Sequence, residues 1–394
     1  GTWAIVVLLA CALAVGAVAV CFAEGGSRVP SSGGAYAYIA NAFGPMNGHI
    51  VGTMLWFSNL LADGGIAAAL GDTVASVAPP AATAAVRALV IVGVIGGIAV
   101  VNLLSVRAGV RLLGGATVVK MLPLAAFLLF GASGVRAANL GLHSVGTANL
   151  AGIGRAGILA VFAYMGMEGA LCASGEVRDP SRNIPRALFA TLGLVTALYL
   201  AIQVVAQGIL GAALAGSAAP LADAIARVNP GLRGLLILGT SLSLFGWLCS
   251  DILSTPRVVF AGARDGLLPR VFGRVAAGRG TPYVAIIAYA SAAAAIALAG
   301  GFTELAVLSA LAMAPVYVGG CLAAVSLKRR GVALAGAPLG FRGLGVAAAV
   351  GVGSMILMVA MASRAEILGL CAALALSALG YAISRRGAAV RFSS

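Results

Sequence analysis

The sequence predicts an all-α protein, a polytopic bundle of transmembrane helices with almost nothing outside the bilayer. Three observations support this fold class. The 394 residues are 61% hydrophobic and only 9% charged, with a mean hydropathy of +1.07, whereas soluble domains contain about 25% charged residues. Apolar segments long enough to cross a bilayer recur along the chain. Basic residues collect in alternate connections between these segments, as they do in the cytoplasmic loops of membrane proteins.

Eleven apolar segments account for most of the chain. A β-barrel would instead show segments of about ten residues with strict alternation, so helices are the spanning unit that these segments fit. The 55 glycines suit the close approach of helices in lipid. The expected spans are 3–22, 48–70, 88–106, 114–131, 156–174, 188–210, 234–260, 283–299, 304–326, 343–362 and 366–383.

The basic residues also predict an orientation. Connections on one side of the bundle carry 17 of the 25 lysines and arginines, and connections on the other side carry 6. The richer side, which includes the C-terminus, is predicted to be cytoplasmic. With eleven spans, the N-terminus then lies outside. Because the chain begins with Gly1 and enters an apolar segment without a charged leader region, we expect that one helix precedes it; the alternative is a natural eleven-span protein.

Several classes of function are disfavoured. The net charge of +14 follows from loop placement, and no basic run is interleaved with aromatic residues, so we expect no nucleic-acid partner. The six cysteines lie in apolar stretches without metal-ligand spacing, which predicts no metal and no cofactor. No G-x-x-x-x-G-K-[ST] loop supports ATP-driven transport. The histidines His49 and His143 are far apart, and no hydrolase motif supports a membrane-embedded enzyme.

Four ionisable residues lie well inside the predicted spans. Each costs about 2.5–3.5 kcal/mol on insertion scales, so such residues are functional candidates by default. They are Asp63, Lys120, Glu168 and Asp251. Arg257 lies nearer the end of its segment, where its long side chain can reach the interface, and we interpret it as structural.

The segment 162–170 contains two glycines that flank Glu168. Glycine weakens a helix interior, and freed backbone groups survive at membrane depth only beside a cavity. The pattern predicts either a broken helix that aims backbone groups at a solute or a glycine face packed against a neighbour, and both remain open. The following segment, 176–186, holds two prolines and five charges, and Pro185 is expected to begin the next helix.

Four blocks of sequence resemble the amino acid/polyamine/organocation permeases, and their order and spacing make the resemblance specific. The blocks are 23–38, 102–123, 162–186 and 256–269. The resemblance implies the LeuT-like fold, with two inverted repeats of five helices followed by two more helices. Residues 1–131 would hold helices two to five, residues 155–330 helices six to ten, and residues 341–386 helices eleven and twelve of a single transport domain. Helix one would be absent.

The same resemblance assigns roles around the broken helix. Phe162 is similar to the aromatic gate beside the substrate. Ala163, Met165 and Gly166 are similar to the broken stretch whose carbonyl groups receive the α-amino group of a substrate. Glu168 resembles the acid just past the break, a candidate for proton or gating work.

On helix three, Ser58, Asn59 and Asp63 are expected to face the same substrate site, because Asn59 and Asp63 are four residues apart and share one face. A carboxylate at Asp63 favours a cationic side chain or a polyamine as substrate. A protonated carboxylic acid that only donates a hydrogen bond remains an alternative.

Lys120 matches the position at which some proton-coupled members of these permeases carry a lysine. Ser250 and Asp251 match the region where sodium-coupled members use Ser or Thr ligands. We hypothesise that Lys120 and Asp251 form a buried pair whose protonation couples to alternating access. A static structural ion pair is the alternative.

The resemblance therefore implies secondary transport of an amino acid or related amine, by proton-coupled symport or exchange, through alternating access. The expected partners are that substrate, protons and the lipid bilayer, and the expected location is a plasma membrane, namely a bacterial inner membrane. A sensor that kept the fold without transport is an alternative, and an embedded enzyme is another. Because helix one of these permeases holds the substrate carboxylate, we expect this chain alone not to transport.

Overall fold

The computed structural model describes residues 3–29, 35–104, 121–141, 150–168, 180–217, 219–264, 268–276, 281–334 and 338–391. Within these ranges the chain is helical and contains no strand, which confirms the predicted all-α class. Seven helices are long and apolar enough to cross a membrane, and four shorter apolar helices accompany them. Each of these eleven helices overlaps one of the eleven predicted segments, so apolar length was a sufficient signal for the described parts. Residues 105–106, 114–120 and 169–174 of the predicted segments lie outside the described residues.

The chain divides into two compact units. Unit 1 comprises Gly1–Ile5, Asn59–Thr147 and Leu200–Ala306, and unit 2 comprises Val6–Ser58, Ala148–Tyr199 and Val307–Ser394. Each unit is therefore discontinuous in sequence. Four helices contribute residues to both units. They are α1 (Trp3–Arg28), of which only residues 3–5 belong to unit 1, α3 (Pro45–Ala75), α9 (Pro180–Leu210) and α13 (Phe302–Arg329).

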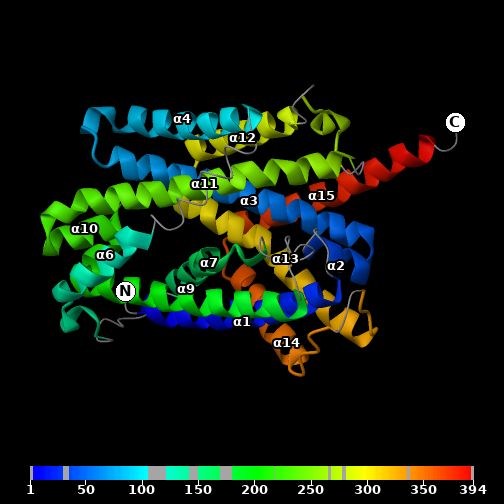
Figure 1. Cartoon of the computed structure of the whole chain (residues 1–394), viewed down its shortest axis with the longest axis horizontal. Helices are drawn as coiled ribbons and strands as arrows, with labels where there is room; N and C mark the ends of the chain where they lie inside the picture. Colours follow the sequence, from blue (N-terminus) through cyan, green and yellow to red (C-terminus); the bar gives the residue numbers. More distant parts are fainter. Residues whose placement is uncertain are drawn as a thin grey trace. The chain divides into compact units, whose positions relative to one another are not determined.

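Unit 1 is arranged around one long helix. Its remaining α-helices are α4 (Thr83–Leu104), α6 (Met121–Gly131), α10 (Pro220–Val228), α11 (Arg233–Arg264) and α12 (Tyr283–Ala299). Helix α11 packs against the other four, and α4 lies beside α12 (Figure 1). The approach of α11 to α6 depends on a glycine, because a Cβ at Gly239 would lie 2.1 Å from Cγ of Pro123. Small residues thus allow close helix packing here, as expected in lipid.

Unit 2 has an aromatic core. Its remaining α-helices are α2 (Ala35–Phe43), α7 (Leu150–Tyr164), α14 (Leu344–Ala360) and α15 (Arg364–Arg391). The ring of Phe22 packs edge-on against Tyr38 and Tyr317, with centroid distances of 5.8 and 5.7 Å. A Cβ at Gly320 would lie 2.3 Å from Phe22, so α13 meets this ring through a glycine.

A buried ion pair closes the end of α1. Arg28 and Glu24 are 5% and 0% exposed, and Nη2 of Arg28 lies 2.7 Å from Oε1 of Glu24. The pair also binds the segment after α13: Arg28 donates to the carbonyl of Val332, and Oε2 of Glu24 accepts from the amide of Phe341. The charge count treats Arg28 as a loop residue, whereas the structure places it inside unit 2.

Two features of the connections differ from the sequence-based expectation. Helices α2 and α10 have nine residues each, too few to cross a bilayer, so a search for apolar spans passes over them. Helix α9 begins at Pro180 rather than at Pro185, which lies inside it. Proline suits the first position of a helix, and Pro180 occupies that position.

Candidate functional site

The predicted break lies in unit 2, at the end of α7. This helix stops at Tyr164, and residues 167–168 are helical again. Gly166 has a φ of +118°, and a Cβ built there would meet no atom within 4 Å. Backbone conformation therefore requires this glycine, and packing does not. The helix is interrupted at Gly166, which favours the broken helix over the glycine packing face, the two alternatives that the sequence left open.

Glu168 folds back onto the break. The amide N–H of Gly166 donates to both carboxylate oxygens of Glu168, at 3.2 Å each. The hydroxyl of Tyr317, on α13, donates to the same two oxygens at 3.4 and 3.3 Å. Glu168 is only 6% exposed. This acid thus links the interrupted backbone to the aromatic core of unit 2, an arrangement suited to gating.

Residues at the break that were expected to contact substrate already have hydrogen-bond or packing partners within the protein. The carbonyl of Ala163 accepts a hydrogen bond of 2.8 Å from the hydroxyl of Tyr199 on α9. Phe162 and Met165 are half-buried and pack against the core of unit 2. Of the carbonyl groups expected to receive a substrate amine, that of Ala163 therefore already has one donor.

Ser58 is a packing residue in this structure. Its hydroxyl donates to the carbonyl of Ser309 at 2.8 Å, and the hydroxyl of Ser309 donates to the carbonyl of Ser58 at 2.9 Å. Both side chains are 0% exposed. The reciprocal bonds hold α3 against α13 and use the Ser58 donor, so its expected contact with substrate stays a prediction.

Unit 1 contains a polar network that joins three helices. Tyr289, on α12, places its hydroxyl 3.0 Å from Oδ2 of Asp63 on α3 and 3.4 Å from Oδ2 of Asp251 on α11. The hydroxyl of Thr255 donates to the same oxygen of Asp251 at 2.8 Å and accepts from the amide of Asn59 at 3.4 Å. Asp63 and Asp251 therefore share the hydroxyl of Tyr289, although the sequence predicted separate tasks for the two acids.

The electrostatics of this network are unusual. Asp63 is 0% exposed, and its Oδ1 has no hydrogen-bond partner among the described residues. The hydroxyl of Tyr289 carries one proton and faces two carboxyl groups, so it can fully satisfy only one at a time. No described basic side chain forms an ion pair with either acid. A site of this kind is suited to holding a proton.

Two members of the network were missed by sequence reasoning. Tyr289 and Thr255 are neutral, so at membrane depth they cost far less than a charge and do not stand out. The spacing offered one usable signal, because Thr255 follows Asp251 by four residues and so lies on the same helical face.

The remaining predicted coupling residues outside the interrupted helix are Ser250 and Lys120. Ser250 is exposed, and its carbonyl accepts from the hydroxyl of Ser254 at 3.0 Å. Lys120 lies outside the described residues, so its pairing with Asp251 stays a prediction. The rest of the exit segment that was expected after the break, residues 169–179, also lies outside them.

Comparison with known proteins shows the family to which the chain is similar. The family model described as amino acid permease matches residues 1–363. An uncharacterized transporter of Mycobacterium bovis is 30% identical over 287 residues, which cover 66% of this chain and 59% of the relative. An uncharacterized transporter of Mycobacterium tuberculosis is 31% identical over 298 residues, covering 73% and 66%. The methylthioribose transporter of Bacillus subtilis is 26% identical over 290 residues, covering 70% and 62%.

The chain thus matches about three-fifths of the length of the Mycobacterium bovis relative and of the methylthioribose transporter, and 66% of the length of the Mycobacterium tuberculosis relative. The family match covers nearly the whole bundle, including the break at Gly166 and the network around Asp63. It agrees with the resemblance carried by the four sequence blocks and with the apolar helices. The chain is an integral membrane protein that belongs to the amino acid permease family of the amino acid/polyamine/organocation superfamily.

Proposed function

We propose that the protein is a secondary transporter of an amino acid or related amine that couples to protons, by symport or exchange, through alternating access. The observation that carries this proposal is the pair of acids, Asp63 and Asp251, that share the hydroxyl of Tyr289 within apolar helices. Ionisable groups at membrane depth are expensive, and they most often mark substrate or proton pathways.

The geometry favours a bound proton over two free charges. Two carboxylates beside one donor repel each other, and burial opposes the charged form of each. A single proton on the pair removes the repulsion and gives the two groups a shared hydrogen bond. The described groups on the neighbouring helices do not supply a counter-charge: α4 contributes the amide of Asn102, which donates to the carbonyl of Ile252, and the guanidinium of Arg257 on α11 donates to the carbonyl of Leu253.

Within this proposal the acids have distinct tasks. Asp63 is fully buried and hydrogen bonded, so it serves as a proton site more readily than as an open ligand for a cationic side chain. Asp251 shares this proton with Asp63. Lys120 would pair with Asp251 and so influence whether that carboxyl group is charged. Glu168 would gate the interrupted helix, because it contacts both Gly166 and Tyr317.

The substrate would bind at the interrupted helix. The carbonyl groups around Met165 and Gly166 suit an α-amino group, and Phe162 would form an aromatic gate beside it. The protein would reside in a bacterial inner membrane with the arginine-rich connections in the cytoplasm.

Uptake by the full-length native protein in proteoliposomes tests this proposal. Radiolabelled arginine, lysine, alanine and serine would be offered with and without an inward proton gradient. Methylthioribose belongs in the same panel, because a relative of this chain carries its name. We expect the gradient to increase accumulation of at least one amino acid. Equal uptake with and without the gradient would contradict proton coupling, and absence of flux for every compound would favour a sensor.

Asp63→Asn separates the two readings of that acid, with Asp72→Asn as its control because Asp72 lies on the same helix, α3, but has a side chain that is 47% exposed. If Asp63 holds the coupling proton, Asp63→Asn abolishes gradient-driven accumulation of neutral and cationic substrates alike. If it binds a cationic side chain, only arginine and lysine uptake falls. Unchanged uptake of all four amino acids would exclude both roles.

A further inference from the structure

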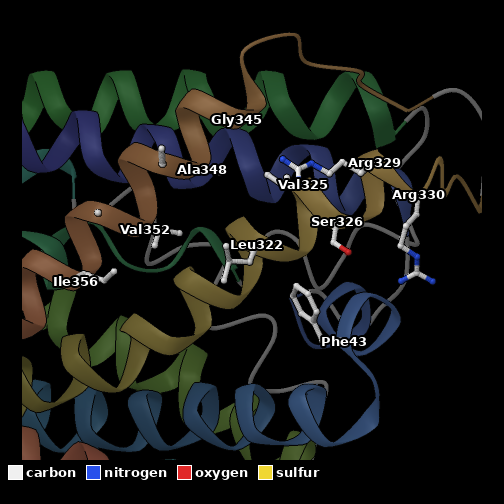
Figure 2. A pocket seen from close by; sticks show the side chains of 12 residues that line it. Phe43, Leu322, Val325, Ser326, Arg329, Arg330, Gly345, Ala348, Val352 and Ile356 are labelled. Carbon is white, nitrogen blue, oxygen red and sulfur yellow. The ribbon is translucent and has the colours of Figure 1, made fainter.

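A groove of about 800 Å³ opens on the surface of unit 2 between α2, α13 and α14. Figure 2 shows the groove with Arg329 and Arg330 toward one end and Ile356 toward the other. It contains none of the residues assigned to transport. A chemical role for this groove is therefore independent of the proposed function.

The walls of the groove are apolar and come from two helices. On α13, the lining residues Leu322, Val325, Ser326 and Arg329 recur at intervals of three and four, so they form one face of the helix. On α14, small residues deepen the groove: Gly345, Ala348, Ala349 and Gly353. Leu322 is 47% exposed and Ile356 is 60% exposed. These exposed apolar side chains fit a hydrocarbon occupant.

The length of the groove matches one leaflet of a bilayer. Its lining along α14 extends from Gly345 to Ile356, and a helix rises about 1.5 Å per residue. The lining is therefore about 16 Å long, close to half of the roughly 30 Å hydrocarbon thickness of a membrane. One acyl chain of a phospholipid spans the same distance.

The charged end of the groove has no acidic partner among the described residues. Arg329 and Arg330 are exposed, and neither takes part in an ion pair in the part of the chain that the structure describes. The guanidinium of Arg330 donates to the carbonyls of Asn41 and Ala42, at 3.4 and 3.3 Å, which holds it beside α2. Two net positive charges thus remain at the point where an apolar groove meets the membrane surface.

We propose that this groove binds an anionic phospholipid, with one acyl chain along α13 and α14 and the headgroup phosphate at Arg329 and Arg330. Arginine guanidinium groups bind phosphate oxygens in a fork geometry. A neutral phospholipid has a phosphate too, but its headgroup ammonium offsets the charge and weakens the attraction. By the arginine count this end of α13 is cytoplasmic, and basic pockets between helices on that side bind anionic headgroups in other membrane proteins.

Competition between two lipids tests the proposal on the unmodified protein. Native mass spectrometry of the full-length chain would be recorded with equal amounts of dioleoyl phosphatidylglycerol and dioleoyl phosphatidylcholine. We expect the anionic lipid to be retained preferentially, as one copy per protein. Equal retention of the two lipids would overturn the proposal. Displacement of the anionic lipid by millimolar inorganic phosphate would overturn it as well, because a free anion would then suffice.

Removing the charges of Arg329 and Arg330 tests whether the anionic lipid binds at this groove. The double variant Arg329→Gln/Arg330→Gln is expected to reduce the preference for the anionic lipid by about thirtyfold, given the usual attraction of each basic residue near an anionic surface. The control is Arg270→Gln/Arg274→Gln, which removes two exposed arginines that also lack described ion pairs. Equal losses in both double variants would show a general charge effect and contradict a specific groove.

Filling the groove provides a second variant that keeps every charge. Gly353→Leu places a side chain in open space inside the groove, because no atom lies within 4 Å of a Cβ there. Gly369→Leu on α15 is the matched control, since its Cβ also meets nothing within 4 Å and the site is outside the groove. We expect only Gly353→Leu to reduce lipid retention. Undiminished retention in Gly353→Leu, with helicity and monodispersity preserved, would place the lipid elsewhere.

Discussion

Gly166 shows how one backbone angle shapes the candidate site. Its φ of +118° is costly for any residue with a side chain, and the space around it is empty. The interruption of the helix frees an amide that donates to Glu168. A backbone conformation that only glycine adopts readily, at a helix break, is typical of a binding or switching region.

Substitution of Gly166 should separate backbone strain from packing. Gly166→Ala is expected to destabilise the protein by about 1–3 kcal/mol, because alanine must adopt an unfavourable conformation. Gly157→Ala, in the preceding helix and equally free of contacts, is expected to stabilise it by about 0.5–1 kcal/mol through helix propensity. Unfolding in mixed detergent micelles measures both. The same sign of effect for both variants would contradict the strain argument.

Tyr289 is the residue through which the two acids are joined. Tyr289→Phe removes the described hydrogen-bond donor to Asp63, so it is expected to cost about 1–3 kcal/mol of stability. Combined with Asp63→Asn, the two losses should not add, because both variants disrupt the same bond. A double-mutant cycle by unfolding in micelles measures the coupling. Strict additivity would show that the two side chains act independently.

At the scale of helices, the ion pair of Glu24 and Arg28 at the end of α1 holds the segment after α13 through hydrogen bonds to backbone groups. Removing one partner leaves the other charge buried, and Glu24 also accepts the amide of Phe341. The sequence gives no direct sign of this contact, because its partners are more than 300 residues apart. Local spacing reveals only that Glu24 and Arg28 share a helical face.

Glu24→Gln is therefore expected to destabilise the protein by about 3–5 kcal/mol, the usual effect of breaking a buried pair. The control is Asp72→Asn, which breaks the exposed pair of Asp72 with Arg87 and should cost less than about 1 kcal/mol. Thermal or detergent-induced unfolding distinguishes the two. Similar losses would mean that Arg28 finds another partner or reaches solvent.

Prediction from sequence succeeded where a single strong signal dominates. Apolar length identified seven candidate spans and four shorter apolar helices among the described residues, and the glycines beside Glu168 gave the break at Gly166 as one of two alternatives. It failed where structure depends on contacts between distant segments. The amphipathic helix α10 is too short for a hydropathy search, and the link from Asp63 to Asp251 depends on Tyr289, a neutral residue more than 200 positions from Asp63 in the chain. Neutral hydroxyl groups at membrane depth carry too small a cost to be noticed individually.

At the scale of the whole molecule, the distribution of arginine and lysine predicts the orientation. Connections on the predicted cytoplasmic side carry 17 basic residues against 6 on the other side. A green fluorescent protein fused to the C-terminus should therefore fluoresce in bacterial cells, because it folds only in the cytoplasm, whereas a fused alkaline phosphatase should be inactive. Active phosphatase with dark fluorescent protein would invert the proposed topology.

The central proposal about function is that Asp63, Asp251 and Tyr289 form a proton site. Its most direct test is substrate-evoked proton entry, measured with a pH-sensitive dye inside proteoliposomes that contain the full-length protein. We predict acidification on substrate addition with the native protein. Asp63→Asn should abolish it while exchange of labelled for unlabelled substrate continues, and Asp72→Asn should leave it intact. Substrate-evoked acidification that persists in Asp63→Asn would contradict the account.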